Sequence, residues 1–137
     1  MKTTMLAITG MIGSVISFLF GGWSAAMTTL AICMAIDYIT GFAVAAVFKK
    51  SPKSETGALE SRAGFKGLCR KGAILLMVLI AHRLDLALGT AFIKDGVITA
   101  YILNDVVSII ENVGLMGLPM PSVITKAIDM LKKETEE

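Results

Sequence analysis

Apolar residues fall into four long runs along the chain, separated by shorter polar segments. The runs cover about residues 5–22, 25–48, 73–93 and 97–118. A helix of about 20 mainly apolar residues crosses the ~30 Å hydrocarbon core of a bilayer. The pattern therefore predicts an all-α integral membrane protein with four transmembrane helices. The first run is the shortest, and three spans, with this run at the membrane interface, remain an alternative.

The C-terminal tail carries a different pattern. Pro119 and Pro121 end the fourth run, and Ser122 is placed to cap a new helix. The apolar positions that follow share helical spacing: Val123, Ile124, Ala127, Ile128 and Leu131. We expect a short amphipathic helix over residues 122–137 at the membrane surface. Without an internal repeat, residues 1–137 read as a single domain.

One polar segment, residues 49–72, is rich in basic residues. Its 24 residues contain seven Lys or Arg and two Glu, an excess of five positive charges. Basic loops stay on the cytoplasmic side of a membrane. We therefore expect a cytoplasmic loop here, and four spans then place both termini and the amphipathic tail in the cytoplasm.

Composition limits the possible functions. Hydrophobic residues make up 55% of the chain, and its net charge of +2 gives no reason to expect nucleic-acid binding. Cys33 and Cys69 lack metal-ligand spacing, and no nucleophile, phosphate-binding or dinucleotide motif occurs. We predict that the protein is not an enzyme and uses neither a metal nor a cofactor.

Ionisable residues inside the apolar runs are the candidate functional residues. They are Asp37, Arg83, Asp85, Asp105 and Glu111, with His82 and Asn104 nearby. Each charge costs roughly 2.5–3.5 kcal/mol at the bilayer centre on insertion scales. One cation cannot neutralise four acids, so these side chains must pair, bind protons, or face water.

The fourth run gathers five polar residues on one side of its helix, within an arc of roughly 120°. This polar stripe consists of Asn104, Asp105, Ser108, Glu111 and Asn112. We interpret the stripe as a surface that faces water or another subunit. In the alternative interpretation, its acids pair with Arg83 and His82 inside a closed bundle.

Other candidates are less specific. Asp37 either binds a neighbouring helix or acts in the function, and both interpretations stay open. His82 and Asp85, three residues apart, favour a local contact. A set of small residues predicts close helix packing: Gly10, Ser14, Ser17, Gly21 and, in the second run, Gly41.

Three stretches together resemble the phage-lysis and toxin-secretion holin family: "DYITGFAVA", "SRAGFKGLCRKG" and "NDVVSIIENVGLMGLPMPSVITKAIDML". The third is the most specific, through Asp105, Ser108, Glu111, Asn112, Gly117, Pro119 and Pro121. Ser61, Gly67 and Lys71 fit the loop pattern, and Asp37 with Gly41 fits the second span.

The resemblance implies a protein without catalytic residues that forms homo-oligomers in the cytoplasmic membrane of a bacterial host. The oligomers would open holes that release an endolysin or a toxin and so time host cell lysis. It also suggests that "MKTTM" allows a longer inhibitory product, an antiholin, from Met1 and a shorter one from Met5, and a single start with an ordinary basic N-terminus is the alternative. A small proton-coupled transporter or channel that uses the intramembrane acids is the main alternative, and a structural membrane anchor is another.

Overall fold

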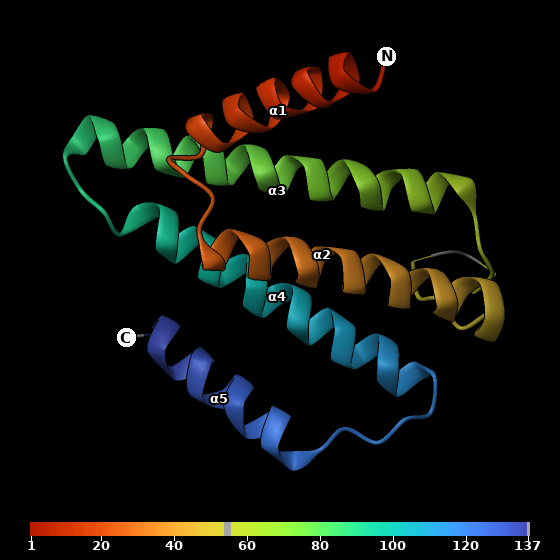
Figure 1. The fold of residues 1–137 in the computed structure, drawn as a ribbon. Helices are drawn as coiled ribbons and strands as arrows, with labels where there is room; N and C mark the ends of the chain where they lie inside the picture. Colours follow the sequence, from red (N-terminus) through yellow and green to blue (C-terminus); the bar gives the residue numbers. More distant parts are fainter. Residues whose placement is uncertain (54–55, 137) are drawn as a thin grey trace.

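The computed structural model describes residues 1–53 and 56–136 of the chain. Its elements are α1 (Lys2–Leu19), α2 (Ala25–Ala43), a π-helical turn η1 (Val44–Phe48) that continues α2, α3 (Ser61–Leu88), α4 (Ile93–Leu115) and α5 (Ser122–Glu136) (Figure 1). Within these two ranges every regular element is a helix and none is a strand. The all-α prediction is therefore confirmed.

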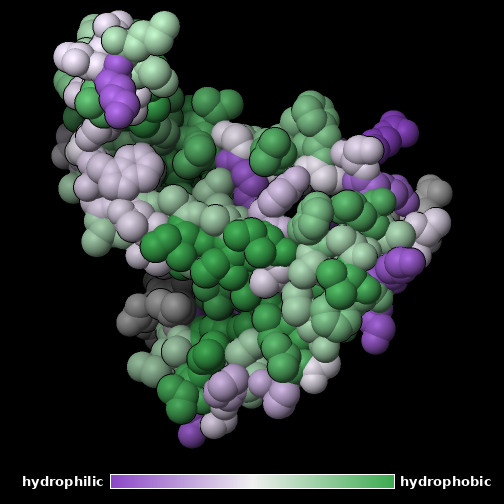
Figure 2. Space-filling view, turned by 45° about the vertical axis from the view of Figure 1, so that its right-hand side comes forward, coloured by the Kyte–Doolittle hydropathy of each residue, from purple (hydrophilic) through white to green (hydrophobic). Residues whose placement is uncertain are grey.

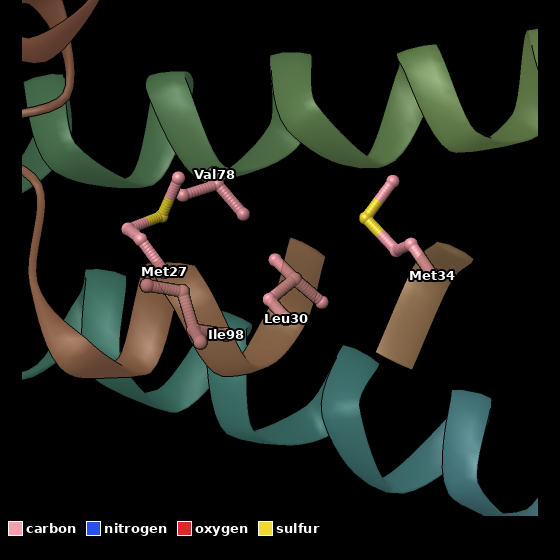
Figure 3. Close-up of a cluster of buried hydrophobic side chains, with 5 residues drawn as sticks. All are labelled: Met27, Leu30, Met34, Val78 and Ile98. Carbon is pink, nitrogen blue, oxygen red and sulfur yellow. The ribbon is translucent and has the colours of Figure 1, made fainter. Parts of the chain in front are cut away.

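Helices α2, α3 and α4 form a bundle in which each contacts the other two, and α5 lies along α4 (Figure 1). Five buried side chains form its apolar cluster: Met27, Leu30 and Met34 of α2, Val78 of α3 and Ile98 of α4. Figure 3 shows them pointing into the space between the three helices. This apolar cluster is therefore small, and its five members come from three helices.

Helix α1 has no buried residue and joins the bundle only near its C-terminal end. Gly21 has a φ of 75°, and an added Cβ would lie 2.2 Å from the His82 ring of α3. The Lys94 ammonium of α4 donates a hydrogen bond to the Phe20 carbonyl oxygen. Glycine is required at position 21 both for its backbone conformation and for space.

The polar loop between α2 and α3 is shorter than the predicted residues 49–72. Helix α3 begins at Ser61, so the loop ends at residue 60 and the last four of its seven basic residues lie on the helix. Tertiary contact explains the difference, because the Tyr38 ring packs beside Gly64 and Gly67. The Tyr38 hydroxyl also donates to the Gly64 carbonyl oxygen at 3.4 Å.

The turn between the third and fourth runs also differs from the sequence-based expectation. Residues 97–118 would leave "KDG", residues 94–96, as the turn, but α4 begins at Ile93. The chain turns at residues 89–92, where Gly89 adopts a left-handed φ of 68° and ends α3. A glycine at this position commonly terminates helices.

Helix α5 follows the proline-containing segment, as its sequence pattern indicates. It begins at Ser122 and extends to Glu136, while residue 137 lies outside the described residues. Its Ile128 is buried, whereas Val123 and Met130 are largely exposed. The location of this helix at a membrane surface stays a prediction.

Large apolar side chains cover much of the outer surface of the protein. In Figure 2 hydrophobic residues occupy most of the visible face, and hydrophilic ones gather mainly along its right-hand edge. Three helices among the described residues are long and apolar enough to cross a membrane: Lys2–Leu19, Ala25–Phe48 and Ile93–Leu115. Apolar surface this extensive requires an apolar environment such as lipid.

Candidate functional site: a buried ion cluster beside a polar cavity

An ion cluster joins the three helices of the bundle. The Lys71 ammonium of α3 donates to Asp37 Oδ2 of α2 at 2.5 Å and to Asp105 Oδ1 of α4 at 3.1 Å. Asp37 is 6% exposed and Asp105 only 1% exposed. One cation on α3 thus holds two buried acids that belong to two other helices.

Asn112 extends this network toward the end of α4. Its amide Nδ2 donates to the Thr40 hydroxyl at 2.9 Å and to the Asp37 carbonyl oxygen and Oδ1, both at 3.3 Å. Thr40 in turn donates to the Ile36 carbonyl oxygen at 2.8 Å. Gly41 lies beside the Asn112 amide, and a Cβ added there would lie 3.7 Å from Asn112 Nδ2, an ordinary van der Waals contact.

The charges of the ion cluster do not cancel if both acids are ionised. Asp37 and Asp105 carry two negative charges and Lys71 carries one positive charge. Among the described residues, Asp105 Oδ2 is buried without a hydrogen-bond partner. Buried charges are tolerated when they are paired, and removing one partner is strongly destabilising. The cluster therefore makes the packing of the bundle depend on a single lysine.

A cavity of about 360 Å³ opens beside the ion cluster. Its walls come from α2, the loop, the first half of α3 and the second half of α4, and they include Asp37, Lys71 and Asp105. Four further charged residues line it: Lys53, Glu60, Arg70 and Glu111. Charged groups of both signs thus face one hollow within the bundle.

The five residues of the polar stripe separate into two groups in the structure. Asn104 and Glu111 are exposed, Ser108 is half-buried, and all three line the cavity. Asp105 and Asn112 are buried against α2 and α3. The single polar arc therefore has an edge at the cavity and an edge inside the bundle.

The pairing partners named in the alternative interpretation of the stripe are not the ones that the structure places beside the acids. Arg83 is exposed, and in the described ranges it forms no ion pair. His82 lies against Gly21. Lys71 takes their place, because α3 begins early enough to bring the supposed loop lysine alongside Asp37 and Asp105.

The small residues of the first run fall into two groups, one exposed and one in contact with the rest of the protein. Gly10 and Ser14 are exposed, and an added Cβ on Gly10 would meet no atom within 4 Å. Ser17 is half-buried, and Gly21 packs against the bundle. Packing of Gly10 and Ser14 against another helix stays a prediction that would require a second chain.

Asp85 caps the first turn of α4 from the end of α3. Its Oδ1 accepts from the Thr90 hydroxyl at 2.6 Å and from the Ile93 amide at 3.0 Å, and its Oδ2 accepts from the Lys94 amide at 2.9 Å. The first amides of a helix have no partner within it, and a carboxylate there also stabilises the helix dipole. Asp85 therefore has a structural role in joining α3 to α4.

Replacing Asp85 with alanine should destabilise the bundle. Hydrogen bonds to charged groups contribute about 1.5–3 kcal/mol each, and the substitution removes three of them. We expect the midpoint of unfolding in detergent, followed by circular dichroism, to fall clearly. Asp95→Ala is the matched control, because Asp95 is an exposed acid in the same turn of α4. Equal midpoints for the two variants would contradict the capping role.

Lys71 belongs to the candidate site, although the sequence pattern alone places it in the basic loop. It also fits the loop pattern of the family that the chain resembles. The sequence does carry a signal, because the four acids in the apolar runs outnumber the one cation there, Arg83. A third helix that begins at Ser61 includes Lys71 and so supplies a second cation.

The site offers no metal centre, since no group of three or more His, Cys, Asp or Glu side chains in the described parts of the chain could hold a metal ion. Three candidate spans, an apolar exterior and an ion cluster that joins α2, α3 and α4 define a helical membrane protein. Residues 14–133 match the bacteriophage holin family. The chain belongs to this family.

Related proteins are similar over most of the chain. An uncharacterized protein of Halalkalibacterium halodurans is 38% identical over 127 residues, covering 88% of each chain. One of Listeria monocytogenes, Lmo0128, is 36% identical over 129 residues, covering 91% of this chain and 86% of the relative. A probable holin of Bacillus phage phi105 is 32% identical over 107 residues, covering 74% and 70%. No solved structure matches the chain.

Proposed function

We propose that this protein is a holin that oligomerises in the cytoplasmic membrane of a bacterial host and opens holes there. Its cargo would be an endolysin or a toxin, and the moment of opening would set the time of lysis. The observation that carries the proposal is the family match over residues 14–133. A homologue named probable holin, from a Bacillus phage, supports the same function.

The geometry supports assembly of several copies. The cavity of about 360 Å³ is far smaller than a folded enzyme, because even a 100-residue domain has a radius of gyration of about 13 Å. The three helices around it also close on the apolar cluster. A passage for a folded protein therefore needs many chains, with the cavity edge of the polar stripe turned toward water in the open assembly.

Four spans and two cytoplasmic termini are the topology that we propose. Helix α3 carries more charge than the three candidate spans, but it packs against α2 and α4, and its Val78 belongs to the apolar cluster. A helix in contact with both neighbours must share their depth in the membrane. The basic loop, residues 49–60, would then remain in the cytoplasm.

Single cysteines test this topology in a chain that carries Cys33→Ser and Cys69→Ser. Cysteines at the exposed positions Lys50 and Lys133 should react with an impermeant maleimide only after the membrane is permeabilised. A cysteine at Ala91, in the turn between α3 and α4, should react in intact spheroplasts. Reaction of Lys50→Cys in intact spheroplasts would overturn the proposed orientation.

Release of dyes from liposomes tests the proposed function directly. Liposomes that contain the purified protein should release markers of increasing size, up to folded proteins, once a threshold amount of protein is reached. A proton-coupled transporter would release none of them passively. Induced expression in a bacterium should likewise stop growth abruptly, whereas a structural anchor should leave growth intact.

Membrane lipid and further copies of the chain are the proposed partners. Cargo would pass through the holes without specific binding. A product that starts at Met1 keeps Lys2 ahead of the first span, and a cation there resists movement of that terminus across the membrane. The longer product would act as an antiholin, and replacing Met5 with leucine should then change the time of lysis.

A further inference from the structure

The cavity reaches deep into the bundle from the loop end. Its lining runs from loop residues such as Lys53 and Glu60 to the ion cluster and ends at Ile74. A cavity holds water when it is roomy and offers several polar partners, and each water occupies about 30 Å³. The volume of about 360 Å³ accommodates several waters, and the polar edge of α4 supplies partners through Asn104, Ser108 and Glu111.

In all three helices the side chains inside the bundle change from polar to apolar at the depth of the ion cluster. On α2, Met34 lies three residues from Asp37, and the apolar cluster continues to Met27. On α3, Ile74 and then Val78 follow Lys71 toward the opposite end. Helix α4 runs antiparallel to α3, so its Ile98, which precedes Asp105, lies on that same side of the ion cluster.

The apolar cluster is thick enough to stop water and ions. Met27 and Asp37 are ten residues apart, which is about 15 Å along a helix. Met27, Leu30, Val78 and Ile98 are each no more than 1% exposed (Figure 3). Beyond the cluster the polar residues begin again, at His82 and Asp85 near the turn between α3 and α4.

We infer that the resting chain holds a water-filled vestibule that admits small hydrophilic molecules from the loop side as far as the ion cluster. The apolar cluster closes it on the other side and is the barrier to ion leakage through a single chain. This inference concerns one chain before any hole opens, so it stands or falls separately from the proposed function. In this state the cavity edge of the polar stripe is already wet.

Thiol reactivity tests the vestibule in a chain with Cys33→Ser and Cys69→Ser. The protein is placed in liposomes at an amount that leaves them tight to small dyes, and a charged, impermeant methanethiosulfonate reagent is added from one side at a time. Lys50→Cys, on the loop, reports which side is the loop side in each preparation. Ser108→Cys, a near-isosteric change in the cavity wall, should react from that same side.

Ile39→Cys is the matched control, because Ile39 is 64% exposed on the outside of α2 close to Asp37 and Thr40. It should react at least roughly 100-fold more slowly than Ser108→Cys, since the reactive thiolate does not form in hydrocarbon. Val78→Cys in the apolar cluster should stay unmodified from both sides. If Ser108→Cys fails to accumulate, the reactivity of Ala63→Cys, in the cavity wall on α3, is measured in its place.

Two results would overturn the inference. In the first, the cavity cysteine is as unreactive as Ile39→Cys, which would mean that lipid or side chains fill the space. In the second, it reacts only from the side opposite Lys50→Cys, which would place the opening at the wrong end. Neither result would bear on whether liposomes release large dyes at higher amounts of protein.

Discussion

Replacing Lys71 with methionine should strongly destabilise the protein. The change leaves Asp37 and Asp105 close together and without their shared cation. Breaking a buried ion pair by removing one partner costs about 3–5 kcal/mol. We expect less protein to accumulate in the membrane and the midpoint of unfolding in detergent to fall sharply.

Two further variants separate charge from packing at this position. Lys66→Met removes an exposed cation from the same helix, and it should leave the unfolding midpoint nearly unchanged. Adding Asp37→Asn and Asp105→Asn to Lys71→Met makes the cluster neutral, and it should restore much of the lost stability. If Lys71→Met and Lys66→Met unfold at the same point, the ion cluster has no stabilising role.

Replacing Glu111 with leucine should abolish or delay the release of large cargo while leaving the bundle intact. Glu111 is exposed at the cavity and has no ion-pair partner in the parts of the chain that the structure describes. Removing its charge should favour membrane insertion and lower the ability of α4 to face water. Lysis time after induction and release of dyes from liposomes measure the effect, and Ile109→Leu is the control.

Asp105→Leu provides a comparison on the same helix, about 9 Å from Glu111 along the axis. It removes one acid of the ion cluster and leaves Lys71 paired with Asp37, so insertion should again be retained. Cargo release should fail here as well, because this acidic position of α4 would no longer face water in an open assembly. Normal accumulation and normal lysis timing in both variants would mean that these acids only pack.

The sequence pattern predicts much of the fold because apolar runs of helical length are a strong signal in a membrane protein. It identified the all-α class and located Asp37, Asp105 and the other acids whose burial demands an explanation. Two boundaries could not be read from it. Tyr38 stabilises the glycine-containing start of α3 through a contact 26 residues away in the chain, and Asp85 moves the start of α4 by capping it from α3.

The candidate site was predicted less completely for the same reason. A helical arc places Asn104, Asp105 and Asn112 on one side of α4 but does not say what each of them meets. Their separation into a cavity edge and a buried edge depends on where α2 and α3 pack. Lys71 was assigned to the loop because positive charge there also serves orientation, and only the early start of α3 brings it to the acids.

With Asp85 joining them at the turn, α3 and α4 form a helical hairpin that is fixed at one end and held by an ion pair toward the other. At the turn, the Asp85 carboxylate joins the last turn of α3 to the first turn of α4 through hydrogen bonds of 3.0 and 2.9 Å from two backbone amides. At the open end, the Lys71–Asp105 contact is the ion pair that joins the two arms among the described residues. Force that pulls these arms apart therefore concentrates at the loop end, and the joint at the turn acts as the pivot.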